Sequence, residues 1–358
     1  MTDSIFPLDR IHIELTNRCN FSCTFCPNSQ MTRPLGNMDF DLLVRILDEI
    51  SRYNLTRVVL FHLMGEPLCY PDLIEAVRYA AKKGLDVYLS TNGSLLDENN
   101  TYALMESGFS RLILSLQTPD DMTFKSRLSA LSFEEYKSRL ISIVRMMMKA
   151  PYSTEVRVIF LATPWRLLFL PAIKDKTVVV NNASLQGHLK KWFDWLVDDE
   201  ALEESGREKV YRVLGKTKGR YLNHIQITDR LFFETRILGD WGEKKIDRKR
   251  YRRARIGYCP ALREHLGILW NGDIVFCCTD FNGDTAVSNI NRTTIRDYYK
   301  NEFIRQVIQG FQDHRVLAEH CQYCLGGPNL LHKTVRQIGS IFYFKLYRKH
   351  QDHCVSCL

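Results

Sequence analysis

The alternation of strand-like and helix-like segments in the first half of the chain constrains its fold more than any other feature. Short apolar runs typical of buried strands recur at residues 11–15, 57–63, 86–90, 111–117 and 155–161. Helical patterns lie between most of them, at residues 40–53, 73–83, 97–107 and 133–149, and Gly84 and Gly108 end two of these helices. Five β/α units in succession predict a parallel sheet curved into a barrel or a partial barrel.

The pattern changes after Trp165. Residues 177–182 and 231–241 are both candidates for a further barrel strand, and the pattern alone does not choose between them. Residues 187–214 are rich in charge and have helical periodicity, so we expect an inserted helical segment there. The predicted fold class is α/β, a partial (β/α)6 TIM-like barrel with a small C-terminal domain of hairpin plus helix.

Composition limits the cellular setting. The chain has 358 residues, which suits one large domain and a smaller one, and no stretch reaches the ~20 apolar residues of a membrane span. The first ten residues include Asp3 and Asp9 and have no long apolar core, so they do not resemble a secretory signal. We therefore expect a cytoplasmic protein, whose 11 cysteines are better explained as metal ligands than as disulfides.

The formal net charge is +8, and eight of the thirteen residues in 243–255 are Lys or Arg. Such a run fits either a solvated surface or contact with an anionic partner such as a phosphorylated substrate, a nucleic acid or a lipid headgroup. Nucleic acid is not the expected partner, because only Trp241 and Tyr251 are available near the run to stack on bases.

Three cysteines, Cys19, Cys23 and Cys26, follow the first predicted strand with the spacing Cys-x3-Cys-x2-Cys. A cubane iron–sulfur cluster normally takes four thiolates, so three ligands leave one iron able to bind something else. Zinc is the alternative, but it would need a fourth ligand from a distant part of the chain. The motif, with Phe25 before the last cysteine, resembles the signature of the radical S-adenosylmethionine (SAM) superfamily.

A second motif supports this resemblance. Met64-Gly65-Glu66-Pro67 directly follows the second predicted strand and resembles the Gly-Gly-Glu-Pro motif with which the family binds the methionine amino group of SAM. Met64 replaces the first glycine of that motif. The resemblance assigns the polar residues at the next two strand ends to the SAM ribose and carboxylate. The cofactor-binding candidates are Phe25, Gly65, Glu66, Pro67, Ser90, Asn92, Ser115 and Gln117.

A second cysteine set lies near the C-terminus. Cys259 and Cys277 flank two alternating segments joined by Asn271-Gly272, a strong hairpin signal, and a helix predicted over 294–309 leads to Cys321 and Cys324. This arrangement resembles the SPASM and shorter Twitch domains, and is closer to Twitch. It implies one auxiliary iron–sulfur cluster, expected to be [4Fe-4S], while zinc in the same four thiolates stays an alternative. Cys278 is expected to be a bystander.

We therefore divide the chain into a radical SAM barrel at 1–250 with a substrate-shaping insertion at about 165–230, a SPASM/Twitch-like domain at 251–330, and a basic amphipathic tail at 331–358. The tail is either a packing helix or one that rests on a membrane surface. Cys354 and Cys357, near its end, are either ligands of another cluster or part of a frayed terminus.

The resemblance implies a function. A [4Fe-4S] cluster on Cys19, Cys23 and Cys26 would bind SAM and cleave it reductively to a 5′-deoxyadenosyl radical, which abstracts hydrogen from the substrate. A flavodoxin or ferredoxin would supply the electron. The expected substrate is a small, polar, carbohydrate-like molecule, phosphorylated or lipid-linked, which is oxidised by two electrons with help from the auxiliary cluster. No catalytic side chain is assigned.

Two other functions are compatible with parts of the sequence. A radical SAM maturase would modify a peptide, but only ten residues precede the first strand and they do not accommodate a peptide-binding domain. A zinc-dependent nucleic-acid-binding protein would use the basic run and the cysteine pairs without catalysis.

Overall fold

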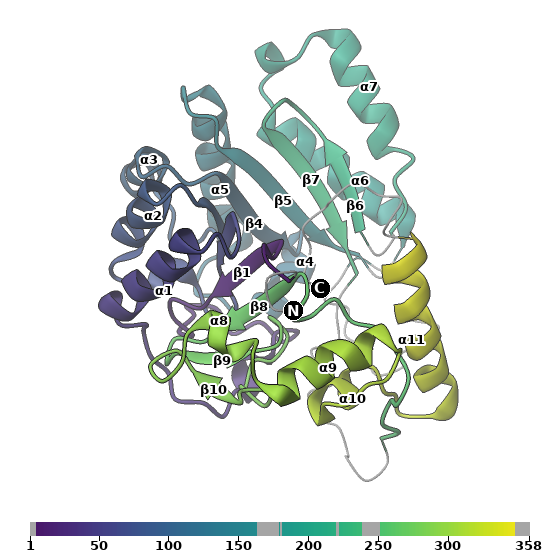
Figure 1. Cartoon of the computed structure of the whole chain (residues 1–358). Helices are drawn as coiled ribbons and strands as arrows, with labels where there is room; N and C mark the ends of the chain where they lie inside the picture. Colours follow the sequence, from purple (N-terminus) through teal and green to yellow (C-terminus); the bar gives the residue numbers. More distant parts are fainter. Residues whose placement is uncertain (1–4, 163–178, 180, 220–221, 238–250, 348–358) are drawn as a thin grey trace.

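The computed structural model describes residues 5–162, 179, 181–219, 222–237 and 251–347. Its centre is a curved sheet of ten strands in the order β10-β9-β8-β1-β2-β3-β4-β5-β7-β6. Strands β1 to β5 run parallel to their neighbours: β1 Arg10–Ile13, β2 Val58–Phe61, β3 Asp86–Thr91, β4 Arg111–Gln117 and β5 Glu155–Leu161. Figure 1 shows helices outside this sheet, as in a partial barrel.

The helices after the first strands begin and end as their sequences predict. They are α1 Phe40–Arg52, α2 Leu73–Lys82, α3 Glu98–Glu106 and α5 Phe133–Lys149. The Asp39 side chain caps α1, and reciprocal capping boxes begin α3 and α5. The buried residues of α1, among them Leu43, Ile46 and Ile50, recur at helical spacing and join the main core.

The sixth barrel strand is β7, Leu231–Arg236, which pairs in parallel with β5, and β6 Leu222–Gln226 adds an antiparallel edge. Of the two candidate strands in the sequence, the later one therefore occupies this place, although Trp241 lies outside the described residues. Of residues 177–182, positions 179, 181 and 182 are described; Asn181 caps α6 Asn182–Leu196, and α7 Glu204–Leu214 follows. These two helices form the predicted helical insertion.

The C-terminal hairpin extends the barrel sheet. Strand β8, His265–Ile268, runs parallel to β1, and β9 Asp273–Val275 and β10 Ser288–Asn289 continue beyond it in antiparallel order. The helix expected over 294–309 is wrong as a single element. It is divided into α8 Ile295–Tyr298 and α9 Glu302–Gln312, because the Asn301 side chain accepts hydrogen bonds from the backbone of Phe303 and Ile304 and starts a new helix.

Helices α10 Glu319–Cys324 and α11 Leu330–Phe342 follow α9. Three short helical elements lie earlier in the chain, near the strand ends: η3 Pro67–Cys69, α4 Asp121–Phe124 and η4 Lys125–Arg127. No described helix has the length and apolar character that crossing a membrane requires. Most of the basic run at 243–255 lies outside the described residues. The division of the chain into domains at 250 and 330 stays a prediction.

Candidate active site

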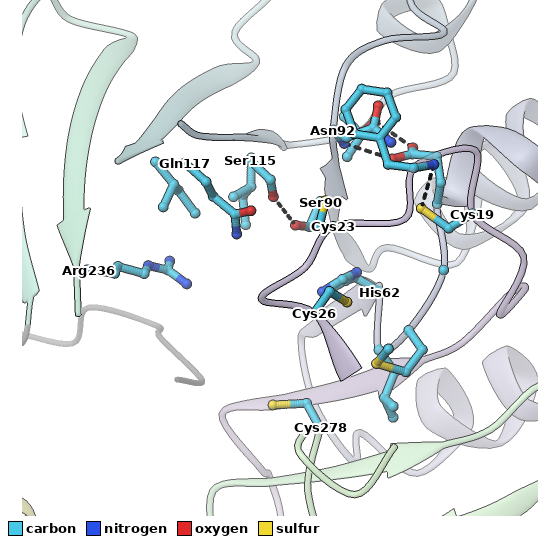
Figure 2. A pocket seen from close by; sticks show the side chains of 18 of the residues that line it. Cys19, Cys23, Cys26, His62, Ser90, Asn92, Ser115, Gln117, Arg236 and Cys278 are labelled. Atoms are coloured by element: carbon cyan, nitrogen blue, oxygen red, sulfur yellow. Dashed lines mark hydrogen bonds between the residues drawn. The ribbon is translucent and has the colours of Figure 1, made fainter. Parts of the chain in front are cut away.

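A pocket opens at the carboxyl ends of the parallel strands, where β/α barrels place their active sites (Figure 2). It gathers nearly all the candidate residues of the barrel half of the sequence. Those that line it are Cys19, Cys23, Phe25, Cys26, Gly65, Glu66, Ser90, Asn92, Ser115 and Gln117. Pro67 is the exception: it is buried at the start of η3, just behind Glu66.

The loop with the three cysteines is held by its neighbours on two sides. The backbone N–H groups of Ser22 and Thr24 donate to the carbonyls of Arg127 and Ser126, at 3.2 and 2.8 Å. On the other side, the side-chain oxygen of Asn20 accepts a hydrogen bond from the side-chain NH2 of Asn92, just after β3, at 2.9 Å. Helix η4 and the residue after β3 therefore hold the loop in place, which keeps its three thiols in the pocket wall.

Burial raises the pKa of the Cys19 thiol to about 12, with the Glu66 carboxylate and the neighbouring Cys23 and Cys26 adding to the rise. Such thiols stay protonated unless a positive charge compensates the thiolate. A metal centre supplies that charge and deprotonates coordinating thiols outright. The donor set therefore fits a [4Fe-4S] cluster with three protein thiolates.

Gly65 brings the chain after β2 against the cysteine loop. Its φ is +77°, and a Cβ there would meet the carbonyl oxygen of Thr16 and lie 2.8 Å from that of Arg18. The next N–H, that of Glu66, donates to the same Arg18 carbonyl at 2.7 Å. Only glycine combines the left-handed conformation with so close a backbone contact.

The variant Gly65→Ala is expected to be less stable than the matched variant Gly84→Ala. Both glycines have a φ of +77°, so both variants bear the cost of about 1–2 kcal/mol for a left-handed alanine. No atom lies within 4 Å of a Cβ at Gly84, whereas at Gly65 overpacking adds about 1–3 kcal/mol. Thermal denaturation of the two variants measures the difference, and equal losses would contradict the close contact at Gly65.

Glu66 is a buried carboxylate anchored to β3. It accepts hydrogen bonds from the Thr91 hydroxyl at 2.5 Å, the Asn92 N–H at 2.7 Å and the Leu68 N–H at 3.2 Å. Burial raises the pKa of Glu66, while these donors and the more distant Arg127 act in the opposite direction. A cationic ligand group beside Glu66 would further favour its charged form.

The ends of β3 and β4 present polar groups beside Glu66. The hydroxyls of Ser90 and Ser115 lie 3.5 Å apart, and Gln117 has a positive φ of 57°. Arg127, on η4, donates to the Gln117 side chain at 2.8 Å and to the Ser115 carbonyl at 2.7 Å. Arg127 thus holds these two strand-end residues in place, a positioning contact that the sequence did not reveal.

Several residues that line the pocket were not among the candidates from the sequence, and besides Arg127 four of them carry ring nitrogens or a guanidinium. Arg10 and His12 on β1, His62 after β2 and Arg236 at the end of β7 all line it. Figure 2 shows Arg236 approaching from β7, and its guanidinium also pairs with buried Glu234 at 2.6 Å. Among the described lining residues the arginines are Arg10, Arg127 and Arg236, against one carboxylate, that of Glu66.

The second cysteine set also converges. Burial raises the pKa of Cys321 well above its usual value, and the proximity of Cys259, Cys277 and Cys324 raises it further. As at the first set, neighbouring buried thiols need a metal centre to be held as thiolates. The donor set fits the auxiliary cluster that the spacing predicted.

Asp280 organises the loop that follows Cys277. Its carboxylate accepts from the N–H groups of Gly283, Asp284 and Thr285 at 2.7–2.9 Å and from the Thr285 hydroxyl at 2.6 Å. Asp280, Asp284 and His320 also have ligand atoms within 4.8 Å of one another. Because Asp280 is fully engaged with the backbone, we interpret this group as loop structure.

Cys278 differs from its expected bystander role in one respect. It forms part of the pocket wall, where Cys278 is buried and shares an apolar cluster with Cys26 (Figure 2). Cys69 is half-buried and does not line the pocket. Cys354 and Cys357 lie outside the described residues.

Two family models match the chain. The model of the radical SAM superfamily matches residues 13–159, and that of the SPASM iron–sulfur cluster-binding domain matches residues 259–325. These ranges contain the two cysteine sets, so the iron–sulfur interpretation is supported over zinc at both. The finer distinction between SPASM and Twitch stays a prediction.

Curated relatives match part of the chain. The cofactor-modifying protein of the tungsten-containing aldehyde ferredoxin oxidoreductase of Pyrococcus furiosus is 32% identical over 106 residues, 30% of each chain. The PqqA peptide cyclase of Gluconobacter oxydans is 35% identical over 106 residues, 29% of each chain. The chain thus spans under a third of the length of these relatives.

Among solved structures, Streptococcus suis SuiB bound to S-adenosylmethionine is similar in fold. The TM-score is 0.53 at 16% identity, covering 86% of this chain and 68% of that one. At this identity the similarity concerns the fold alone.

Proposed function

Because the chain belongs to the radical SAM superfamily and carries a SPASM-type iron–sulfur cluster domain, we propose that it uses SAM to oxidise a small, polar, anionic substrate. The observation that carries the proposal is the single pocket shared by the three-cysteine loop, Gly65, Glu66 and the polar ends of β3 and β4. When bound, the cluster and SAM supply a one-electron cleavage that yields methionine and a 5′-deoxyadenosyl radical able to abstract hydrogen from the substrate.

In this proposal the residues of the pocket bind and orient SAM. Cys19, Cys23 and Cys26 hold the cluster, and the buried Glu66 carboxylate attracts the methionine ammonium, since a charge-assisted hydrogen bond is strong away from water. Gly65 lets the backbone approach closely. Ser90, Asn92, Ser115 and Gln117 are the proposed contacts of the SAM ribose and carboxylate, and Phe25 is a further proposed cofactor-binding residue.

The walls of the pocket favour a particular kind of substrate. Leu60, Ile113 and Ile159 form an apolar cluster that lines it and keeps water away from the reacting centre. Arg10 and Arg236 also line the pocket and offer cationic groups, which are suited to a phosphate or carboxylate. We infer a small anionic molecule such as a phosphorylated sugar.

The proposed oxidation removes one hydrogen atom, one electron and one proton from the substrate, two electrons in all. The four-cysteine site, Cys259, Cys277, Cys321 and Cys324, is the proposed place for the electron acceptor. A flavodoxin or ferredoxin is the proposed electron donor for SAM cleavage, in a cytoplasmic setting.

Formation of 5′-deoxyadenosine tests the proposed class of reaction. The protein is purified and reconstituted with iron and sulfide without oxygen, then mixed with SAM and dithionite, and the products are separated by chromatography. We expect 5′-deoxyadenosine and methionine in equal amounts, and neither when dithionite is omitted. An iron-loaded protein that leaves SAM intact would refute the proposal.

Peptide modification is the second candidate, because the chain resembles a PqqA peptide cyclase over 106 residues. A panel of deuterated phosphorylated sugars, unphosphorylated sugars and peptides separates the two. Transfer of deuterium from a phosphorylated sugar into 5′-deoxyadenosine would identify the small anionic class. Transfer only from a peptide would replace it with the maturase function.

A further inference from the structure

Helix α11 presents a row of large apolar side chains to solvent. Four of them, spaced by three or four residues, lie along one face of the helix: Leu331 is 64% exposed, Val335 50%, Ile338 63% and Phe342 57%. Leu330, at the start of the helix, is 61% exposed as well. Figure 1 shows α11, in yellow, on the outside of the molecule. We call these five residues the apolar face of α11.

The opposite side of α11 is fixed to the four-cysteine half of the protein. Gln337 accepts from the backbone of Arg255 at 3.1 Å, Ser340 accepts from that of Tyr258 at 3.1 Å, and Arg336 donates to the Tyr251 hydroxyl at 2.8 Å. These contacts set the rotation of the helix about its axis. These hydrogen bonds therefore direct the apolar face outward, so its exposure does not result from loose attachment of the helix.

The sequence in and around α11 carries charge of one sign. From His320 to Gln351 the sequence has no Asp or Glu, while it has Lys333, Arg336, Lys345, Arg348 and Lys349. An apolar helix face in a segment whose only charges are Lys and Arg is the pattern of helices that lie in the interface of a membrane, where anionic headgroups attract positive charge. A protein partner of mixed charge would not require the absence of acidic residues over so long a stretch.

We propose that α11 docks on an anionic membrane surface, with its apolar face buried among the headgroups and the net positive charge of this part of the chain attracted to the lipid phosphates. The helix has 13 described residues, which suits a helix lying in the interface. Docking in this way would hold the enzyme at a membrane while the contacts of Gln337 and Ser340 keep α11 attached to the body of the protein.

Vesicle binding by the full-length holoprotein tests this proposal. Vesicles of phosphatidylcholine with phosphatidylglycerol are compared with vesicles of phosphatidylcholine alone, at low and high salt, in a flotation assay. We expect binding to the anionic vesicles, weaker binding to the neutral ones, and a decrease at high salt. The double variant Leu331→Gln, Ile338→Gln is expected to bind at least about ten-fold more weakly, because two apolar side chains no longer enter the interface.

The matched control replaces two exposed apolar residues far from α11 in the sequence, Met122→Gln and Val213→Gln, and is expected to bind like the wild type. Iron content and thermal denaturation establish that all variants are folded. Equal binding by the wild type and the α11 variant, or no binding by the wild type, would overturn the proposal. A concentration-dependent dimer that only the α11 variant disrupts, without vesicle binding, would assign the face to a second copy of the chain instead.

Discussion

A variant with Cys19, Cys23 and Cys26 all replaced by alanine is expected to form no 5′-deoxyadenosine while keeping about half of the bound iron. The three thiols are the only described cysteines on the loop between β1 and α1, and in the proposed function they hold the cluster at which SAM is cleaved. The four-cysteine site lies on other segments and keeps its own donors. Product analysis and iron determination on anaerobically reconstituted protein measure both effects.

The thiol-removal control is Cys69→Ala, since Cys69 is half-buried and does not line the pocket. It is expected to retain both the full iron content and SAM cleavage. The complementary variant, Cys321→Ala with Cys324→Ala, should lose the other half of the iron. Zinc but no iron in the triple variant would contradict an auxiliary iron–sulfur cluster at Cys259, Cys277, Cys321 and Cys324.

The sequence was sufficient for those parts of the site that lie directly after strands. Parallel strands that alternate with helices end at one edge of the sheet, so Gly65, Asn92 and Gln117 meet although they are far apart in the chain. The cysteine loop follows the same rule. Local patterns therefore located most of the pocket without knowledge of any long-range contact.

Residues that point inward from the middle of strands were not found in this way. Arg10 and His12 alternate with the buried Ile11 and Ile13, a period-two pattern that places the polar pair on the barrel interior. That alternation was present in the sequence and could have identified them. Arg236 had no comparable signal, because its place in the pocket depends on which segment pairs with β5.

The continuation of the sheet from β1 into β8 had no local signal at all. The two strands are separated by about 250 residues, and their register is fixed by pairing, from Arg10 with His265 to Ile13 with Ile268. The hairpin signal at Asn271-Gly272 is independent of where the hairpin packs. The sequence therefore indicated a small C-terminal unit but not that its hairpin extends the barrel sheet.

The second large effect concerns a contact between the segment after the three-cysteine loop and the hairpin part of the four-cysteine region. The variant Arg33→Met is expected to lose about 3–5 kcal/mol in the free energy of unfolding. The Arg33 guanidinium forms two hydrogen bonds with the Glu14 carboxylate, at 2.7 and 2.8 Å, and a third with the Phe281 carbonyl at 2.7 Å. Glu14 also accepts from the Trp270 N–H at 3.1 Å. The variant leaves a buried carboxylate without its cation.

The matched control is Arg78→Met, which removes an exposed ion pair with Glu75 and should cost less than about 1 kcal/mol. Anaerobic urea denaturation followed by tryptophan fluorescence measures both variants.

The effect of Arg33→Met also depends on pH. Burial raises the pKa of Glu14 against the opposing effect of Arg33, so removal of Arg33 raises the pKa of Glu14 further. A carboxyl with a raised pKa in the folded state binds a proton on folding, and the protein loses stability as the pH rises from the unfolded pKa of 4.5 through the folded one. The deficit of Arg33→Met should therefore be smaller near the unfolded pKa than at neutral pH, and a deficit that grows on acidification would contradict the stabilisation of a buried Glu14 carboxylate by Arg33.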